Sequence, residues 1–373
     1  MNLKIAVLSG DGIGPEVIKQ AVAVLKAVAE FYNHTFEFEE GLVGAIAINK
    51  TGSPLPEATL NLCKSADAIL FGAIGDPKYD NNPDAKVRPE QGLLDLRKEL
   101  GLFANIRPIK VITPLIDKSP LKRNVIEGTD ILIFRELTGG IYYGEKKLSE
   151  DGRVATDVCE YSQMEIERIT HLAFKAAQTR RNKVTLVDKA NVMESSRLWR
   201  RVVKEIAKQY PKVTLNVLYI DNAVKQMILN PNQFDIILTD NLFGDILSDE
   251  GSVIVGSIGL LASASVGTQY AMFEPIHGTY PQAKGKNIAN PIAAILSAVM
   301  LLDNFGLNEE ANAIRKAVEL TLEHNIVTPD INVVRNFGTD HVGETIVSSI
   351  LNNEDPNGYI NLENISIGKS IFF

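Results

Sequence analysis

The sequence contains only two cysteines, and it lacks both a long apolar run and an excess of basic residues. Cys63 and Cys159 lie far apart without the spacing of a metal-binding motif, so we expect reduced thiols in a cytoplasmic protein. The longest apolar run, from Ile292 to Leu302, is too short to span a bilayer and predicts a buried helix. The net charge of -8, without a basic stripe, argues against nucleic acid and anionic membranes as partners.

The chain also lacks internal repeats, low-complexity tracts and long flexible linkers. Met1 leads directly into a strand-like apolar run at residues 4–8, which does not have the layout of a signal peptide. The length of 373 residues suits two domains or one large α/β unit, and the apolar content is ample for a core. We therefore expect a soluble globular protein.

Apolar runs of strand length alternate with helical patterns, which predicts an α/β protein with a largely parallel sheet. The expected strands cover residues 4–8, 68–71, 131–134, 184–187, 215–220 and 234–238. The expected helices include 165–177, 198–208 and a terminal helix at 343–351. Ligands of open α/β sheets bind beyond the carboxyl ends of strands. Charged residues at several strand ends therefore predict the rim of a site: Arg135, Asp188, Lys189, Asp221 and Asp240.

The clearest sign of a metal site is a pair of acids on an expected helix that begins after Gly244. Asp245 and Asp249 lie four residues apart on one face of this helix, where their like charges repel each other. Apolar residues at 246–247 and 253–254 place the pair near a core. We therefore predict a divalent cation held by carboxylate oxygens. Two solvated acids at an exposed helix end are the alternative.

Three arginines, Arg97, Arg107 and Arg135, supply the positive half of the expected site. The planar guanidinium suits bidentate binding of carboxylates, so these residues and a cation predict a pocket for a small polycarboxylate. Lys189 follows an apolar strand, and nearby cations could lower its pKa enough for it to act as a base. The phenol of Tyr142 could donate a proton. Surface arginines, a solvated lysine and a packing tyrosine are the alternatives.

The glycine-rich turn from Gly10 to Gly14 gives only weak support for a Rossmann dehydrogenase. Its Gly-x-Gly-x-Gly spacing is not the dinucleotide fingerprint, and Pro15 removes an amide that could face a phosphate. A second unusual segment lies between residues 139 and 161. Short strands at 141–144 and 153–157 predict a hairpin, either an arm toward a partner subunit or a simple surface hairpin. No function is assigned to the tail at 352–373.

Six motifs together resemble those of a known family. They are Asp11–Glu16, Arg135–Tyr142, Asp188–Val192, Asn241–Asp249, Glu274–Gly278 and Gly285–Pro291. They occur in family order over about the first 350 residues, which leaves only the tail unmatched. On these motifs the chain resembles the metal-dependent β-decarboxylating dehydrogenases, the isocitrate/isopropylmalate dehydrogenase family.

The resemblance implies a non-Rossmann α/β fold with a large mixed twisted sheet, flanking helices and two domains around a central cleft. Residues 1–101 and 255–373 would form a discontinuous first domain on the cofactor side. Residues 102–254 would form an inserted dimerisation domain, and the arm hairpin at 139–161 would clasp a second subunit. The resemblance thus implies a homodimer with shared active sites.

The resemblance also implies the catalytic roles. Asp245 and Asp249 of one subunit and Asp221 of the other would hold Mg or Mn. Lys189 of the second subunit would be the base when the C2 hydroxyl is oxidised and hydride passes to NAD. The cation would polarise the new carbonyl and hold the enolate oxygen as carbon dioxide leaves. Tyr142 would then help to protonate the enol.

By the same resemblance, the substrate would be a malate derivative. Its contacts would come from Arg97, Arg107, Arg135, Asp221, Glu90, Leu93, Leu94, Asn191 and Val192. Leu93 and Leu94, with Val192 of the other subunit, would form an apolar pocket in which a charged substituent is left unpaired. This implies oxidative decarboxylation of (2R,3S)-3-isopropylmalate to 4-methyl-2-oxopentanoate in leucine biosynthesis. Isocitrate, homoisocitrate or tartrate as substrate, or a non-catalytic regulatory subunit, are the alternatives.

The cofactor would be NAD, bound by loops rather than by a Rossmann turn. The implied contacts are Ile13, Glu274, His277, Gly278, Gln282 and Asn290. NAD-dependent members carry an acidic residue where this chain has Gln282, with Lys284 and Lys286 nearby. A neutral amide can hydrogen-bond a ribose but does not repel a 2′-phosphate, so selectivity for NAD over NADP stays open.

Overall fold

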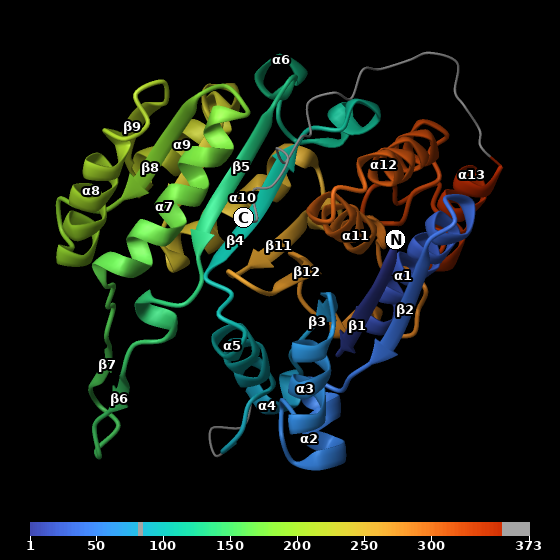
Figure 1. Ribbon diagram of the computed structural model, residues 1–373, viewed down its shortest axis with the longest axis horizontal. Coiled ribbons are helices and arrows are strands. Elements are labelled where there is room, and N and C mark those ends of the chain that lie inside the picture. Colours follow the sequence, from blue (N-terminus) through green and yellow to red (C-terminus); the bar gives the residue numbers. More distant parts are fainter. Residues whose placement is uncertain (81–84, 353–373) are drawn as a thin grey trace.

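The computed structural model describes residues 1–80 and 85–352, and its centre is a ten-stranded sheet flanked by helices (Figure 1). In pairing order the strands are β2 (Thr35–Glu40), β1 (Asn2–Gly10), β3 (Ala68–Ala73), β12 (Ala271–Pro275), β11 (Ala262–Val266), β4 (Ala104–Lys110), β5 (Asp130–Glu136), β10 (Ile236–Thr239), β8 (Lys183–Asp188) and β9 (Thr214–Tyr219). Within this sheet the pairings of β4 with β5, of β4 with β11 and of β11 with β12 are antiparallel, and the other pairings of its described strands are parallel. The expectation of a large mixed α/β sheet is confirmed.

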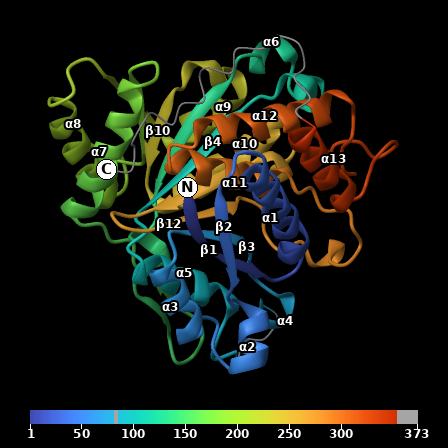
Figure 2. The same cartoon turned by 45° about the vertical axis from the view of Figure 1, so that its right-hand side comes forward.

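Helices cover both faces of this sheet. The α-helices are α1 (Gly14–Phe31), α2 (Ala45–Thr51), α3 (Glu57–Ser65), α4 (Pro77–Asp80), α5 (Pro89–Glu99), α6 (Arg123–Ile126), α7 (Gln163–Gln178), α8 (Glu194–Ala207), α9 (Ile220–Leu229), α10 (Asn241–Val255), α11 (Ile292–Asn304), α12 (Asn308–Glu323) and α13 (Thr339–Leu351). The 3₁₀ turns are η1 (Thr113–Lys118), η2 (Gly140–Tyr142), η3 (Pro231–Gln233), η4 (Ile258–Leu260) and η5 (Pro281–Ala283). Helices α1, α11, α12 and α13 pack on one another beside β1 and β3 (Figure 2). Helix α10 packs on β4 and β5.

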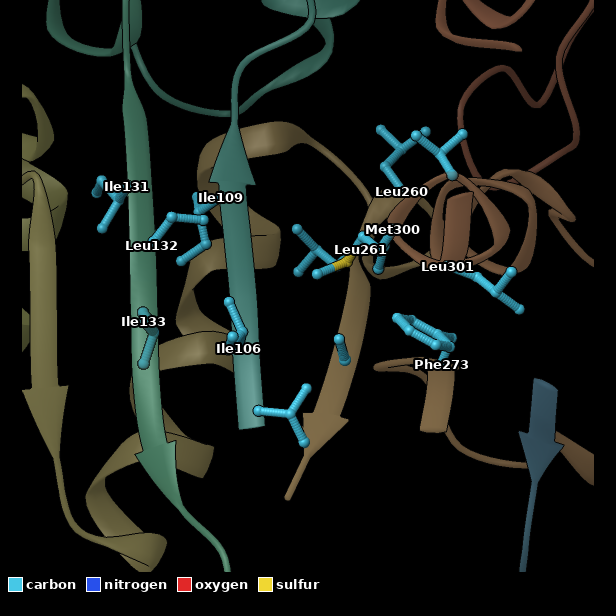
Figure 3. Packing of buried hydrophobic residues seen from close by; sticks show 14 of the residues in the cluster. Ile106, Ile109, Ile131, Leu132, Ile133, Leu260, Leu261, Phe273, Met300 and Leu301 are labelled. Carbon is cyan, nitrogen blue, oxygen red and sulfur yellow. The ribbon is translucent and has the colours of Figure 1, made fainter. Parts of the chain in front are cut away.

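The interior is apolar and continuous across most of the sheet. Strand and helix residues such as Ile106, Leu132 and Phe273 are buried together (Figure 3). Helix α11 is buried along nearly its whole length, as its apolar run predicts. No helix in the described residues is long and apolar enough to cross a membrane. Cys63 and Cys159 are free thiols in this part of the chain, as expected.

Two local predictions are wrong. Helix α10 begins at Asn241, before Gly244, because the carboxylate of Asp240 accepts a hydrogen bond of 2.8 Å from the Phe243 amide and caps the helix. In the arm, residues 141–144 do not form a strand. Gly140 has φ +74° and starts the short turn η2, and the hairpin strands are instead β6 (Lys146–Leu148) and β7 (Ala155–Asp157). The hairpin projects from the body of the protein (Figure 1).

The boundaries of the two predicted domains stay a prediction. The sheet runs across the expected junction, since β11 pairs with β4. Helix α13 begins at Thr339, four residues before its expected start at Gly343. The tail from 353 to 373 lies outside the described residues.

Candidate active site

The predicted acidic pair lies on α10, and Asp245 faces the arginines of β4 and β5. Asp245 Oδ1 forms ion pairs with Arg135 Nη1 and, at 3.3 Å, with Arg107 Nη1. Gly244 permits this close approach, because a Cβ at that position would lie 2.6 Å from Arg135 Cγ. Asp249, one turn further, is 4.0 Å from Arg107 Nη1, and its side chain is 60% exposed. The structure therefore brings the acidic pair and two of the three predicted arginines together.

The antiparallel pairing of β4 and β5 places Arg107 and Arg135 on one face of the sheet. Asn105 is opposite Arg135 in the ladder, and Arg107 is two residues further along β4 on the same side. Asn105 Oδ1 accepts a hydrogen bond from Arg107 Nε. Asn241 Oδ1 accepts hydrogen bonds from Arg135 Nε at 3.0 Å and from Nη2 at 2.7 Å. Both guanidinium groups are thus held in fixed orientations.

Arg97 reaches the same region from α5. Its Nη2 lies 3.0 Å from Glu274 Oε1 on β12, and Ser265 Oγ donates to the same oxygen at 2.7 Å. Arg97 Nε is buried and has no hydrogen-bond partner among the described residues. Glu274, predicted as a cofactor contact, is here the ion-pair partner of Arg97, a predicted substrate residue, and the cofactor role of Glu274 stays a prediction.

The arginines of the cluster repel one another. Burial and then the charge of Arg135 lower the pKa of Arg107 to about 9. Burial opposes the ionisation of Asp245, but Arg135 and Arg107 outweigh it and hold the pKa of that carboxyl below its usual range. Burial and the charge of Asp245 raise the pKa of Asp249. A bound anion would relieve the repulsion between the arginines, and a bound cation that between the acids.

Tyr142 completes this half of the site. Its hydroxyl donates a hydrogen bond of 2.8 Å to Asp245 Oδ2, and its ring centre lies 5.4 Å from the Arg135 guanidinium. Lys146 Nζ donates to the carbonyl oxygens of Ile141 and Tyr142 at 3.0 and 2.9 Å. These bonds hold the turn η2, from which the phenol reaches Asp245.

Lys189 and Asp221 form a second, separate group. Lys189 follows β8 and forms an ion pair with Asp221, which lies in the first turn of α9. The lysine holds the pKa of the Asp221 carboxyl below its ordinary value. The described residues contain no group of three or more His, Cys, Asp or Glu side chains placed to hold a metal ion. One chain therefore does not bring Asp221 to Asp245 and Asp249.

The predicted specificity residues lie on two separate segments. Leu93 and Leu94 are half-buried on α5, and Leu94 O accepts a hydrogen bond of 3.3 Å from the hydroxyl of Tyr143. Glu90 lies beside Gly75. A Cβ atom placed on Gly75 would lie 2.9 Å from Glu90 Oε1. Asn191 and Val192 are exposed near Lys189, and Val192 is 65% exposed.

The predicted cofactor residues surround the start of α1 and the loop after β12. The Ile13 amide donates to Thr279 O at 2.9 Å, which ties the glycine-rich turn to this loop. His277 is buried, and its Nε2 has no hydrogen-bond partner in the described part of the chain. Burial lowers the pKa of this imidazole, so it is neutral at pH 7. Gly278 and Gln282 are exposed.

Asn290 has structural hydrogen bonds. Its Oδ1 accepts from the Ile292 amide at 3.0 Å, which orders the start of α11, and its Nδ2 donates to Asp330 Oδ2 at 3.0 Å. Glu16 Oε1 accepts a hydrogen bond of 2.6 Å from the Gly285 amide and fixes the loop on the other side. A nucleotide role for Asn290 stays a prediction.

The sequence interpretation did not assign roles to three polar residues that orient the arginines. They are Asn105, Asn241 and Ser248, and Ser248 Oγ accepts a hydrogen bond from Arg107 Nη1. Asn105 could have been found from its spacing, because residues two apart on a strand share a face. Ser248 lies three residues after Asp245 and shares a helix face with it. Asn241 opens the Asn241–Asp249 motif, but its contact with Arg135 depends on the packing of α10 and could not be derived from spacing.

Comparisons with known proteins agree with this arrangement. The sequence profile of the isocitrate/isopropylmalate dehydrogenase family matches residues 4–346. The 3-isopropylmalate dehydrogenase of Bacteroides fragilis (strain YCH46) is 54% identical over 352 residues, 94% of this chain and 99% of that protein. The 3-isopropylmalate dehydrogenase of Aquifex aeolicus (strain VF5) is 54% identical over 332 residues, 88% and 91% of the two chains. The crystal structure of isocitrate dehydrogenase from Methylococcus capsulatus matches with a TM-score of 0.84 at 33% identity, covering 94% of this chain and 99% of that one. The chain belongs to the isocitrate/isopropylmalate dehydrogenase family.

Proposed function

We propose that this chain oxidises and decarboxylates 3-isopropylmalate to 4-methyl-2-oxopentanoate and carbon dioxide in leucine biosynthesis, with NAD and Mg or Mn. The observation that carries the proposal is the convergence of Arg107 and Arg135 on Asp245, with Arg97 close enough for its charge to act on both. Three buried guanidinium groups suit a di-anionic substrate, since a bound cation would take up the charge of Asp245 and Asp249. Relatives that are 54% identical over most of the chain carry the name of this activity.

The acidic residues fit a hard divalent cation. Asp249 has no hydrogen bond within the described residues, and repulsion by Asp245 contributes to its raised pKa. Asp245 and Asp249 would hold the cation, and Asp221 of a second subunit would complete the ligand set. Carboxylate oxygens are the ligands that Mg²⁺ and Mn²⁺ prefer. For NAD, the fitting feature is His277, whose buried Nε2 lies without a partner among the residues described.

When bound, the cation would supply Lewis acidity at the C2 oxygen and NAD would accept the hydride. The protein's own residues bind, orient and move protons. The arginines hold the substrate carboxylates, and Lys189 Nζ takes the proton of the C2 hydroxyl. Tyr142 keeps its proton because burial and Asp245 raise its pKa, so its hydroxyl can protonate the carbon from which carbon dioxide departs.

Within one chain, the proposed catalytic and metal-binding residues form two separate groups. This supports an active site that is shared between the two subunits of a homodimer. Lys189 and Asp221 lie outside the cluster around Asp245, and Val192 beside them is 65% exposed. Large apolar side chains are also exposed on α9 and α10, namely Leu229, Leu242, Ile246 and Val253. A second copy of the chain would bury this surface and bring Lys189 to the arginine cluster.

The test is the initial rate of NADH formation with Mg, measured for 3-isopropylmalate and, in parallel, for isocitrate, homoisocitrate and tartrate. A strong preference for 3-isopropylmalate is expected, because Leu93 and Leu94 offer no partner for a charged substituent. A preference for isocitrate would leave the family chemistry intact but would refute the role of the two leucines. Absence of turnover with every substrate would favour a regulatory subunit.

A further inference from the structure

A cavity of about 430 Å³ lies at the opposite end of the central strands from the active site. Its lining includes Asp130 and Leu132 at the start of β5, whereas Arg135 lies near the end of that strand. Arg135 is five positions after Asp130 on β5, which is roughly 16 Å along an extended strand. The walls are the end of β4 and the start of β5 on one side and α11, α12 and η4 on the other. The cavity is therefore distinct from the proposed catalytic site.

One wall of this cavity is apolar. Leu260, Leu261, Val299, Met300 and Val318 contribute to it. Figure 3 shows Leu261 and Met300 close together beside α11, with Leu132 on the strand across from them. The volume lies within the range of small-molecule sites, which combine an apolar lining with a few polar groups.

The polar groups of the cavity fall into two sets. Arg180 is paired with Asp130 at 2.7 Å, and Arg315 is paired with Asp303, so these four charges are already compensated. Lys110 and Glu319 attract each other electrostatically, but neither takes part in an ion pair within the described chain. Among the described lining residues, Lys110 on β4 is thus a cation without an ion-pair partner, and Glu319 on α12 and the exposed Glu127 are carboxylates without one.

A buried hydroxyl lies in the same cavity. Thr129 is 1% exposed, and its Oγ1 has no hydrogen-bond partner among residues 1–80 and 85–352. A buried polar atom without a partner is costly, and such atoms are few in folded proteins. Burial also lowers the pKa of Lys110 and raises that of Glu319, which reflects two charges partly removed from water. All three groups would gain from a polar ligand.

The arrangement selects among ligand charges. A ligand with only a carboxylate would pair with Lys110 but would be repelled by Glu319. A ligand with only an amine would pair with Glu319 but would be repelled by Lys110. We propose that this cavity binds a small zwitterion with an apolar side chain, of the chemical class of an apolar α-amino acid. Its carboxylate pairs with Lys110 and accepts from Thr129, its ammonium pairs with Glu319, and its side chain covers Leu261 and Met300.

Titration calorimetry on the full chain tests this proposal with three matched probes: L-norleucine, hexanoate and pentylamine. The last two probes lack the ammonium and the carboxylate, respectively. We expect saturable binding of norleucine with a dissociation constant of about 1 mM, as befits so small a ligand. Hexanoate and pentylamine are expected to bind about tenfold more weakly or worse, because each loses one charged hydrogen bond. Equal binding of hexanoate and norleucine would overturn the zwitterion assignment.

Three variants locate the site. Lys110→Met and Glu319→Gln are each expected to weaken norleucine binding by about tenfold, and both keep side chains of similar size. Lys316→Met, on the exposed side of α12, is the matched control and should leave binding unchanged. Binding that survives both cavity substitutions would place the ligand elsewhere and refute the proposal. The same conclusion follows if norleucine does not bind saturably up to its solubility limit.

Discussion

Tyr142 donates a hydrogen bond of 2.8 Å to Asp245 Oδ2, so the proposed proton donor and the predicted metal ligand are joined in one chain. The opposite oxygen of the same carboxylate forms an ion pair with Arg135. Asp245 therefore orients the phenol and the guanidinium at once. Its position on the second turn of α10 sets the geometry of this half of the site.

Tyr142→Phe should lower kcat by about 10²–10⁴-fold, the usual contribution of a positioned general acid. Single-turnover reduction of NAD should change far less, because protonation follows hydride transfer and loss of carbon dioxide. Stopped-flow absorbance of NADH separates the two steps. Tyr143→Phe is the matched control, since that hydroxyl donates to Leu94 O and has no other hydrogen bond among the described residues. A kcat within a few-fold of the native value would remove Tyr142 as the proton donor.

Mixed dimers test whether the active site is shared. Lys189→Met and Asp245→Asn should each fold, dimerise and lack activity. An equimolar mixture after subunit exchange should regain about a quarter of native activity, because half the dimers are mixed and each has one intact site. The mixed dimers can be purified with two different tags, one on each variant. If these dimers are inactive, Lys189 does not act in the active site of the other subunit. Near-normal reduction of NAD by the Lys189→Met homodimer would remove Lys189 as the base.

Gly244→Ala should disturb the arginine cluster without changing its charge. The added methyl group would lie 2.6 Å from Arg135 Cγ, so the guanidinium or the helix must shift. Overpacking of this kind costs about 1–3 kcal/mol of unfolding free energy, and a raised KM for the malate substrate should accompany it. Gly278→Ala is the stability control, because a Cβ there has open space around it. Equal unfolding free energies of the two variants would contradict the predicted close contact.

The sequence predicted those strands whose apolar runs are continuous, such as β3 and the core of β5. It did not identify β4, although Arg107 itself was predicted as a site residue, because Arg107 and Pro108 interrupt the apolar pattern in mid-strand. Strand β11 was missed for a different reason. Its residues Ala262–Val266 are small and partly polar, and their burial depends on pairing with β4 and β12. Pairing between strands that are far apart in the chain is difficult to recognise from a short stretch of sequence.

For the candidate site, the sequence identified the residue types but not their partners. The spacing of Asp245 and Asp249 predicted one helix face, and the structure places them there. The ion pair of Arg97 with Glu274 joins residues far apart in the chain and could not be derived from spacing. The start of α10 was misplaced because Asp240 was read as the end of a strand, whereas it caps the helix.

Gln282→Asp should increase selectivity for NAD over NADP. The side chain is exposed at η5, the position at which the resemblance implies an acid in the NAD-dependent members, and Lys284 lies close in sequence. A carboxylate there should raise the KM for NADP by about tenfold or more, since like charges placed together are strongly unfavourable. The KM for NAD should change little or fall. Gln209→Asp, at an exposed position outside this loop, is the control. If Gln282→Asp leaves the ratio of the KM for NADP to the KM for NAD unchanged, residue 282 does not belong to the cofactor site.

Asp240→Asn should stabilise the protein at neutral and alkaline pH. Burial raises the pKa of Asp240 to about 7, so between about pH 4 and 7 the folded state binds a proton that the unfolded state releases. Stability from this group is therefore fully present below about pH 4 and is lost as the pH rises to about 7. Asparagine is neutral throughout and can still accept the capping hydrogen bond from the Phe243 amide. Above pH 7 the variant should gain on the order of 2–4 kcal/mol of unfolding free energy.

Denaturant unfolding at a series of pH values measures this difference directly. The advantage of Asp240→Asn should shrink as the pH falls from about 7 and vanish below about pH 4, where the carboxyl of Asp240 becomes protonated in the unfolded state as well as in the folded state. Asp95→Asn, at an exposed position on α5, is the matched control and should show no such pH-dependent gain. A gain of equal size at pH 4 and pH 8 would mean that the substitution acts through packing and that the buried charge of Asp240 is not its cause.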